Sequence, residues 1–113
     1  MMKKAIRLHP LPPAFIMGYV GMAYYYTEQY EEAINILTSA LKRFPRHNSP
    51  RLWLIATYVA LGKEREAHEE VEKLFEINPQ FSANKWAIGY FASYKDLKMR
   101  DHILEQFAKV GLH

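Results

Sequence analysis

The spacing of apolar residues along the chain predicts a series of helices with short breaks between them. In the clearest stretch, residues at positions i, i+4, i+7 and i+8 are apolar, which places them along one side of an α-helix. These residues are Ala33, Leu37, Ala40 and Leu41. Similar patterns predict helices over 14–27, 30–43, 50–61, 64–77, 82–93 and 96–110. The sequence therefore predicts an all-α fold.

The pattern repeats itself along the chain. Residues 51–79 are a copy of residues 17–45 moved by 34 positions. The residues that recur unchanged include Tyr24 as Tyr58, Ala33 as Ala67 and Pro45 as Pro79. A fixed period of this length is typical of solenoid proteins, in which each helix pair stacks on the next. Two consecutive helix pairs are therefore predicted.

Residues that favour helix ends stand near the predicted breaks. Acidic residues begin the 30–43 helix and basic residues end it, which suits the helix dipole. Ser82, Asp96 and either Asn48 or Ser49 are predicted N-caps, with Pro50 near a first helical position. Gly62 and Gly111 are predicted to end helices.

The 14–27 helix is apolar nearly all round, which is typical of a helix that is buried on two sides. It contains Gly18 and Gly21, and each glycine costs a helix about 1 kcal/mol relative to alanine. A glycine in this position usually has a packing reason. We therefore expect a neighbouring helix to approach closely here.

The repeat loosens after Pro79. Asp101 stands where Ala33 and Ala67 recur, so the small residue that lets two helices approach is lost. Terminal repeats of solenoids are atypical because one of their faces meets water. Residues 82–111 are therefore predicted to form a degenerate terminal helix pair.

The beginning of the chain repeats part of the same pattern. Ala5 and Pro10 have the spacing of Ala40 and Pro45, and proline then enforces an extended link to the next helix. Residues 1–10 are thus predicted to be the tail of a preceding repeat helix, in a longer protein or in one that starts within an array. A simple N-terminal cap helix is the alternative.

The size and spacing of these residues resemble the tetratricopeptide repeat. The matching positions of the first copy are Val20, Gly21, Tyr24, Tyr30, Ala33, Leu37, Ala40 and Pro45. Those of the second copy are Leu54, Tyr58, Gly62, Ala67, Val71 and Pro79, whereas Ile55 stands where that family prefers a small residue. The resemblance implies a right-handed superhelical array in a single domain, with repeats over 14–45 and 48–79.

The resemblance also implies a function in protein–protein interaction. In that family the first helices of the pairs line a concave groove that binds a peptide or partner protein. The positions carried over are Phe15, Gly18, Met22, Tyr25, Tyr26, Ser49, Leu52, Ala56, Val59, Trp86 and Tyr90. None is the Lys, Arg or Asn that would clamp a terminal carboxylate, so an apolar helix is the favoured ligand. Coverage of these residues by the chain's own core or by a second copy is the alternative.

The closing stretch is similar to the end of repeat regions in bacterial multidomain proteins, above all the class III adenylate and guanylate cyclases. The residues concerned are Phe81, Ser82, Trp86, Tyr94, Lys95, Asp96 and residues 108–112. In such proteins a catalytic domain precedes the repeats. Homodimerisation within a larger bacterial signalling protein is therefore a second hypothesis for the function.

Composition and charge argue against other function classes. The net charge of +3 is dispersed, and residues 63–76 are acidic, so the basic stripe of a nucleic-acid binder is missing. The chain has no cysteine and no apolar run of about 18 residues that could span a membrane. His9, His47, His68, His102 and His113 lack metal-ligand spacing, and no glycine-rich phosphate loop is present. The sequence predicts a cytoplasmic protein that is not an enzyme and has no cofactor or metal.

Overall fold

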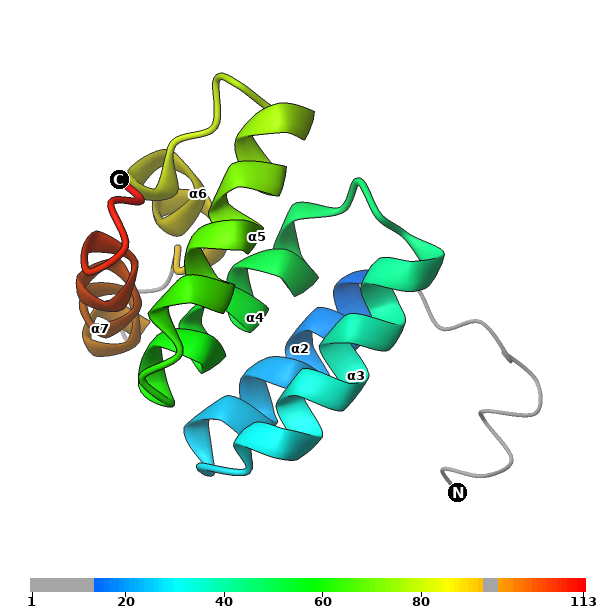
Figure 1. Ribbon diagram of the computed structural model, residues 1–113. Helices are drawn as coiled ribbons and strands as arrows, with labels where there is room; N and C mark the ends of the chain where they lie inside the picture. Colours follow the sequence, from blue (N-terminus) through cyan, green and yellow to red (C-terminus); the bar gives the residue numbers. More distant parts are fainter. Residues whose placement is uncertain (1–13, 93–95) are drawn as a thin grey trace. The chain divides into compact units, whose positions relative to one another are not determined.

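The computed structural model describes residues 14–92 and 96–113, and nearly all of them lie in helices (Figure 1). The helices are α2 (Ala14–Tyr26), α3 (Tyr30–Arg43), α4 (Asn48–Ala60), α5 (Glu64–Ile77), α6 (Ala83–Tyr90) and α7 (Leu97–Ala108). The described residues contain no strand. The predicted all-α fold is confirmed. The segment predicted as the tail of a preceding repeat lies outside the described residues.

The chain divides into two compact units, Met1–Trp53 and Leu54–His113. Of the described helices, the first unit holds α2, α3 and the beginning of α4, and α2 packs against α3. The second unit holds the rest of α4 together with α5, α6 and α7, and α6 packs against α7. We call α2, α4 and α6 the A helices, because each is the first member of a helix pair.

The predicted helix ends are largely correct, with three differences. α4 begins at Asn48, so that Pro50 is its third residue and Ser49 lies within the helix. The N-cap prediction is right for Ser82, whose Oγ accepts a hydrogen bond from the Lys85 N–H at 3.3 Å. It is wrong for Asp96, whose side chain makes no such bond. α6 is also shorter than predicted, since it ends at Tyr90.

The two repeats close their A helices with the same backbone turn. The Gln29 N–H donates to the Tyr24 carbonyl at 2.8 Å, and the Lys63 N–H donates to the Tyr58 carbonyl at the same distance. Each bond reaches back five residues, and a shorter bond from the preceding residue accompanies it. These are the two hydrogen bonds of a Schellman motif. The 34-residue period therefore holds for the backbone as well as for the side chains.

The motif requires one residue in the left-handed conformation, and the two copies fill this position differently. In the second copy it is Gly62, with φ of 75°, which confirms the prediction that this glycine ends a helix. In the first copy it is Glu28, with φ of 60°. Glycine adopts this conformation without penalty, whereas a residue with a Cβ does not. The first turn is therefore the strained one.

We expect the Glu28→Gly variant to be more stable than the parent by about 0.5–1 kcal/mol, since relief of strain outweighs the added entropy of the unfolded chain. Urea unfolding would measure the difference. The matched control is Gly62→Ala, which introduces the same strain in the second turn and should lower the free energy of unfolding by about 1 kcal/mol. Equal stability of Glu28→Gly and the parent would contradict this assignment.

The close approach predicted around the helical glycines is confirmed in the first repeat. A Cβ added to Gly21 would lie 2.4 Å from Cδ2 of Leu37, which is fully buried on α3. In the second repeat, Ile55 takes the place of Gly21 and Val71 takes the place of Leu37. A larger residue on the A helix is thus combined with a smaller one on its partner. The two repeats keep one backbone arrangement and redistribute the side-chain volume.

The last helix pair packs differently. Asp101, Glu105 and Ala108 occupy the repeat positions of Ala33, Leu37 and Ala40, and all three are exposed on α7. α7 buries Ile103 and Phe107 instead, which lie on another side of the helix. On α6, a Cβ at Gly89 would meet no atom within 4 Å, although Gly89 corresponds to Gly21. α7 therefore does not cover the side of α6 that α3 covers on α2.

Candidate functional site

The structure places the predicted groove residues at different depths. Half-exposed are Met22, Tyr26, Trp86 and Tyr90. Buried are Tyr25, Leu52, Ala56 and Val59. Phe15 lies in α2, and its side chain is outside what the structure describes. The half-exposed side chains are the ones that a ligand could touch, and they fall into one aromatic cluster in each unit.

The cluster of the first unit joins the end of α2 to α4. The Tyr25 ring lies 5.7 Å from the Trp53 ring and 5.9 Å from the Tyr30 ring, between centroids. Tyr26 packs edge-on against both Tyr25, at 5.0 Å, and Trp53, at 5.8 Å. Such pairs stabilise a fold by about 0.5–1.5 kcal/mol each beyond the area that they bury. Trp53 is fully buried, so it supports Tyr26 from below.

Both tyrosines of this cluster are neutral at physiological pH. Burial raises the pKa of Tyr26 to about 12. Burial also raises the pKa of Tyr25, and the neighbouring Tyr26 and Tyr30 raise it further. The half-exposed Tyr26 therefore offers an aromatic ring without a negative charge.

The cluster of the second unit lies on α6. The rings of Trp86 and Tyr90 are stacked, with centroids 4.7 Å apart and planes 30° apart. The buried Phe91 packs edge-on against both rings. Phe107 of α7 lies 6.0 Å from Trp86. α7 therefore supports one side of the stacked pair, and both rings of the pair keep part of their surface exposed.

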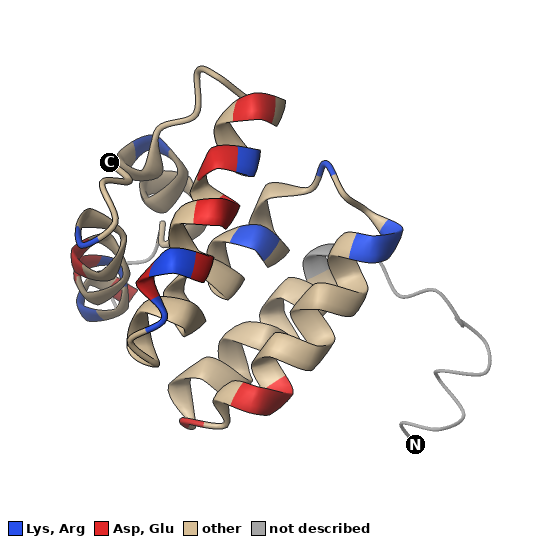
Figure 2. Cartoon of the chain, in the orientation of Figure 1, with Lys and Arg blue, Asp and Glu red and all other residues tan. Residues whose placement is uncertain are grey.

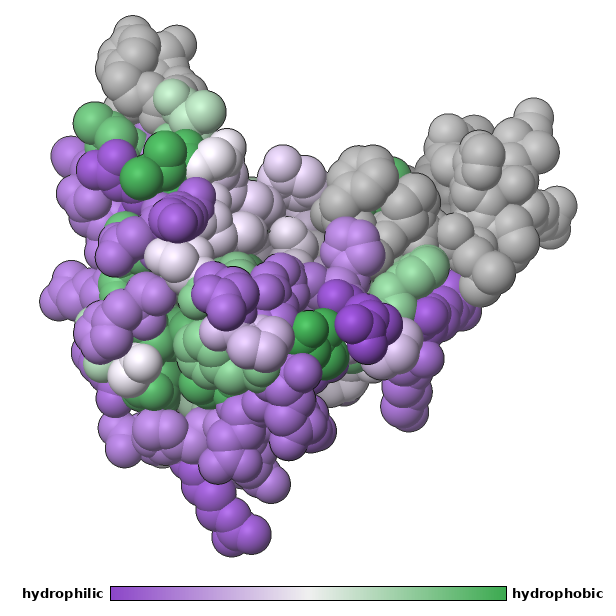
Figure 3. Space-filling view, turned by 90° about the horizontal axis from the view of Figure 1, so that it is seen from above, coloured by the Kyte–Doolittle hydropathy of each residue, from purple (hydrophilic) through white to green (hydrophobic). Residues whose placement is uncertain are grey.

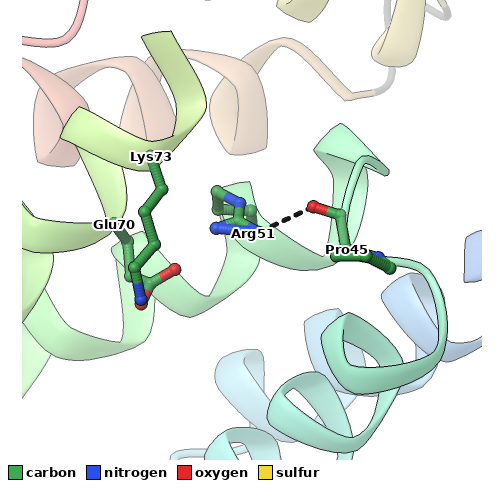
Figure 4. A network of polar contacts seen from close by, with 4 residues as sticks. All are labelled: Pro45, Arg51, Glu70 and Lys73. Carbon is green, nitrogen blue, oxygen red and sulfur yellow. Dashed lines mark hydrogen bonds and ion pairs between the residues drawn. The ribbon is translucent and has the colours of Figure 1, made fainter. Parts of the chain in front are cut away.

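The acidic residues of the chain gather on α5, as Figure 2 shows. They are Glu64, Glu66, Glu69, Glu70, Glu72 and Glu76. Tyr58 on α4 faces this group, because its pKa is raised by burial and then by Glu70, Glu66 and Glu69. Lys73 pairs with Glu70 at 3.4 Å (Figure 4). This helix repels nucleic acid and suits contact with water.

Arg51 has a structural role in the first unit. It is 5% exposed, and its Nη2 donates to the Pro45 carbonyl oxygen at 2.8 Å (Figure 4). This bond ties the link between α3 and α4 to the first turns of α4. The Arg51 charge is therefore held inside the protein rather than presented to a ligand.

Other kinds of site were sought in the part of the chain that the structure describes. There, no three His, Asp or Glu side chains are grouped so that they could hold a metal ion. Among the same residues, no helix has the length and apolar character needed to cross a membrane. Apolar side chains do reach the surface, in patches bordered by hydrophilic residues (Figure 3). Contact with another protein is the chemistry that remains.

Residues 25–87 match the family model of the tetratricopeptide repeat, and this match covers more than half of the chain. The chain belongs to the tetratricopeptide repeat family. Tetratricopeptide repeats are in general non-catalytic protein-interaction modules. None of the curated proteins compared with the chain matches it. The resemblance inferred from the spacing of small and aromatic residues is thus confirmed for the repeats.

Proposed function

We propose that this tetratricopeptide repeat protein binds a peptide or partner protein through the half-exposed aromatic residues of its A helices. The residues concerned are Met22, Tyr26, Trp86 and Tyr90. The observation that carries the proposal is the stacked pair of Trp86 and Tyr90, because both large rings remain partly exposed above a buried base. Tyr and Trp in this setting dominate binding energy at interfaces.

The chemistry of these residues favours an apolar ligand. The tyrosine of the first cluster is neutral, and the buried Arg51 does not offer its charge to a carboxylate. An amphipathic helix that lays its apolar side on the rings satisfies this surface. We expect the buried members of the predicted groove to hold the rings in place without touching the ligand.

The Tyr90→Ala variant tests this proposal. Peptides selected for binding from a displayed library of amphipathic helices should bind this variant about tenfold more weakly, because an anchoring ring has been removed. Titration calorimetry would measure the affinity. Ile88→Ala is the matched control, since Ile88 is exposed on another side of α6, and its affinity should not change. Equal binding by both variants, or failure to select any peptide, would count against the aromatic surface.

Self-association is a second candidate, which a different observation favours. Ile88 is 66% exposed, and the neighbouring Gly89 leaves open space above α6. An exposed isoleucine beside a glycine is a surface that a helix of a second copy could cover. This side of α6 is distinct from the rings of Trp86 and Tyr90, so the two candidates are separable.

Light scattering over a range of concentrations tests self-association. If it is correct, the molar mass should rise above 13.3 kDa with concentration, and the Ile88→Glu variant should remain monomeric because it places a charge in the contact. Leu61→Glu is the control, since Leu61 is another exposed apolar residue of the second unit. A mass of 13.3 kDa at every concentration would rule this candidate out.

The wider setting of the module is also part of this proposal. The closing stretch supports a place in a larger bacterial signalling protein such as a class III nucleotide cyclase, in the cytoplasm. Two residues of that stretch, Tyr94 and Lys95, lie outside the described residues. The test is the reading frame upstream of Met1. A catalytic domain encoded there would support the setting, and an unrelated domain would contradict it.

A further inference from the structure

One side of α2 is exposed although it is apolar. We call it the leading side, and its members share the spacing i, i+3, i+4 and i+7 along the helix. They are Ile16, Tyr19, Val20 and Ala23. Ile16 is 43% exposed and Tyr19 is 49% exposed. Apolar side chains on a single helical side normally face another part of a protein.

The same side of the later A helices is buried. Its members on α4, 34 residues further on, are Pro50, Trp53, Leu54 and Thr57, and all of them are buried. On α6 the residues that correspond to Tyr19 and Ala23 are Ala87 and Phe91, which are buried as well. The leading side of an A helix is thus a contact surface in this chain, and α2 alone leaves it exposed.

The contacts of α4 show which part of an array covers this side. Trp53 on α4 packs against Tyr25 and Tyr26, which belong to the preceding A helix. The link that follows α3 also lies against α4, since Arg51 bonds to the Pro45 carbonyl. The leading side therefore faces the repeat that comes before it in the sequence. For α2, that place belongs to the chain before Ala14.

The sequence before Ala14 matches the segment that occupies this place one repeat later. Ala5 and Pro10 have the spacing of Ala40 and Pro45. α3 ends at Arg43 and α4 begins at Asn48, so residues 44–47 form the link. A helix that ends at His9 would leave residues 10–13 as a link of the same length before α2 begins at Ala14. Both the motif and the link length are therefore repeated.

We propose that residues 3–9 form a short helix that docks on the leading side of α2. In a helix, Ala5, Ile6 and Leu8 lie away from Lys3 and Arg7, so one side of the segment is apolar and the other basic. A helix of this length is not stable alone in water, and it requires such a contact. The segment covers the end of the array and keeps it from associating with a second copy through this side.

Thiol labelling tests the proposal, because the chain has no cysteine. The Tyr19→Cys variant reports on the leading side and should react with a thiol reagent about tenfold more slowly than Ile88→Cys, which lies on the open side of α6. Adding Ile6→Glu should remove this protection by placing a charge in the apolar contact. Adding Arg7→Glu should leave it unchanged, since Arg7 is on the basic side.

Two further measurements separate the remaining outcomes. Ala40→Cys lies in the core of the first unit, and its lack of reaction in the Ile6→Glu background shows that α2 and α3 stay folded. Equally fast labelling of Tyr19→Cys and Ile88→Cys in the parent chain would overturn the proposal. Protection that grows with protein concentration and survives Ile6→Glu would assign the leading side to a second copy instead, which also overturns it.

Discussion

The Gly21→Ala variant is expected to be less stable than the parent by about 1–3 kcal/mol, although alanine is the better helix former. The added Cβ would lie 2.4 Å from Cδ2 of Leu37 and less than 3 Å from its other branch atoms. Leu37 is fully buried, so its side chain cannot turn into open space. α2 and α3 must therefore move apart or Leu37 must leave its preferred rotamer. Thermal and urea unfolding would measure the loss.

The matched control is Gly89→Ala, at the corresponding position of α6. A Cβ at Gly89 meets no atom within 4 Å. Here only helix propensity acts, and the variant should be more stable than the parent by up to about 1 kcal/mol. The same substitution should thus have opposite effects at two corresponding positions. Similar effects at both would contradict the packing difference between the first and last pairs.

A double variant tests whether volume is shared across the helix pair. Leu37→Val introduces the residue that the second repeat has at Val71, opposite the larger Ile55. With Gly21→Ala it should lose less stability than the two single variants together, with a coupling of about 0.5–3 kcal/mol. Simple additivity would show that the two positions do not share their space.

The Ala67→Leu variant is expected to lower the free energy of unfolding by about 1–3 kcal/mol, because it adds volume to a filled contact. Ala67 is fully buried in the first turns of α5, where the period demands a small residue. Chemical unfolding followed by circular dichroism would measure the change. An unchanged unfolding curve would contradict the alignment of the two repeats.

Asp101→Leu is its matched control, since Asp101 takes the repeat position of Ala67 in the last pair. Asp101 is exposed, and its ion pair with Arg100 at 3.2 Å lies at the surface, where such pairs contribute little. The control should therefore stay within about 0.5 kcal/mol of the parent. A large loss would mean that α7 packs through Asp101, which would contradict the arrangement described above.

The aromatic surface was only partly predictable from sequence. The repeat positions correctly singled out Met22, Tyr26, Trp86 and Tyr90 as residues of the A helices, where they are half-exposed. The same reasoning gave no sign that Trp53 would lie beneath the first cluster, since a fully buried tryptophan contacts residues about 30 positions away. The period assigns a residue to a side of its helix, whereas its depth depends on what the neighbouring helices place above it.

The sequence by itself determined the elements and their repetition. Helix positions follow from local spacing, and α3 and α5 have the predicted ends because each carries one apolar stripe and distinct end residues. The turn after each A helix follows from its backbone hydrogen bonds, which bind residues close together in the chain. The burial of Ala33 and Ala67 follows as well, since only a small residue lets two helices approach.

The tertiary structure alone decided which side of α6 is covered. Apolar residues occur on both sides of this helix, with Trp86 and Tyr90 on one and Ile88 on the other, so its sequence pattern singles out neither. α7 packs against Trp86 through Phe107 and leaves Ile88 exposed. The physical reason is that α7 has acidic residues at two of the positions that would contact the Ile88 side, and burying an unpaired carboxylate costs more than leaving one isoleucine in water.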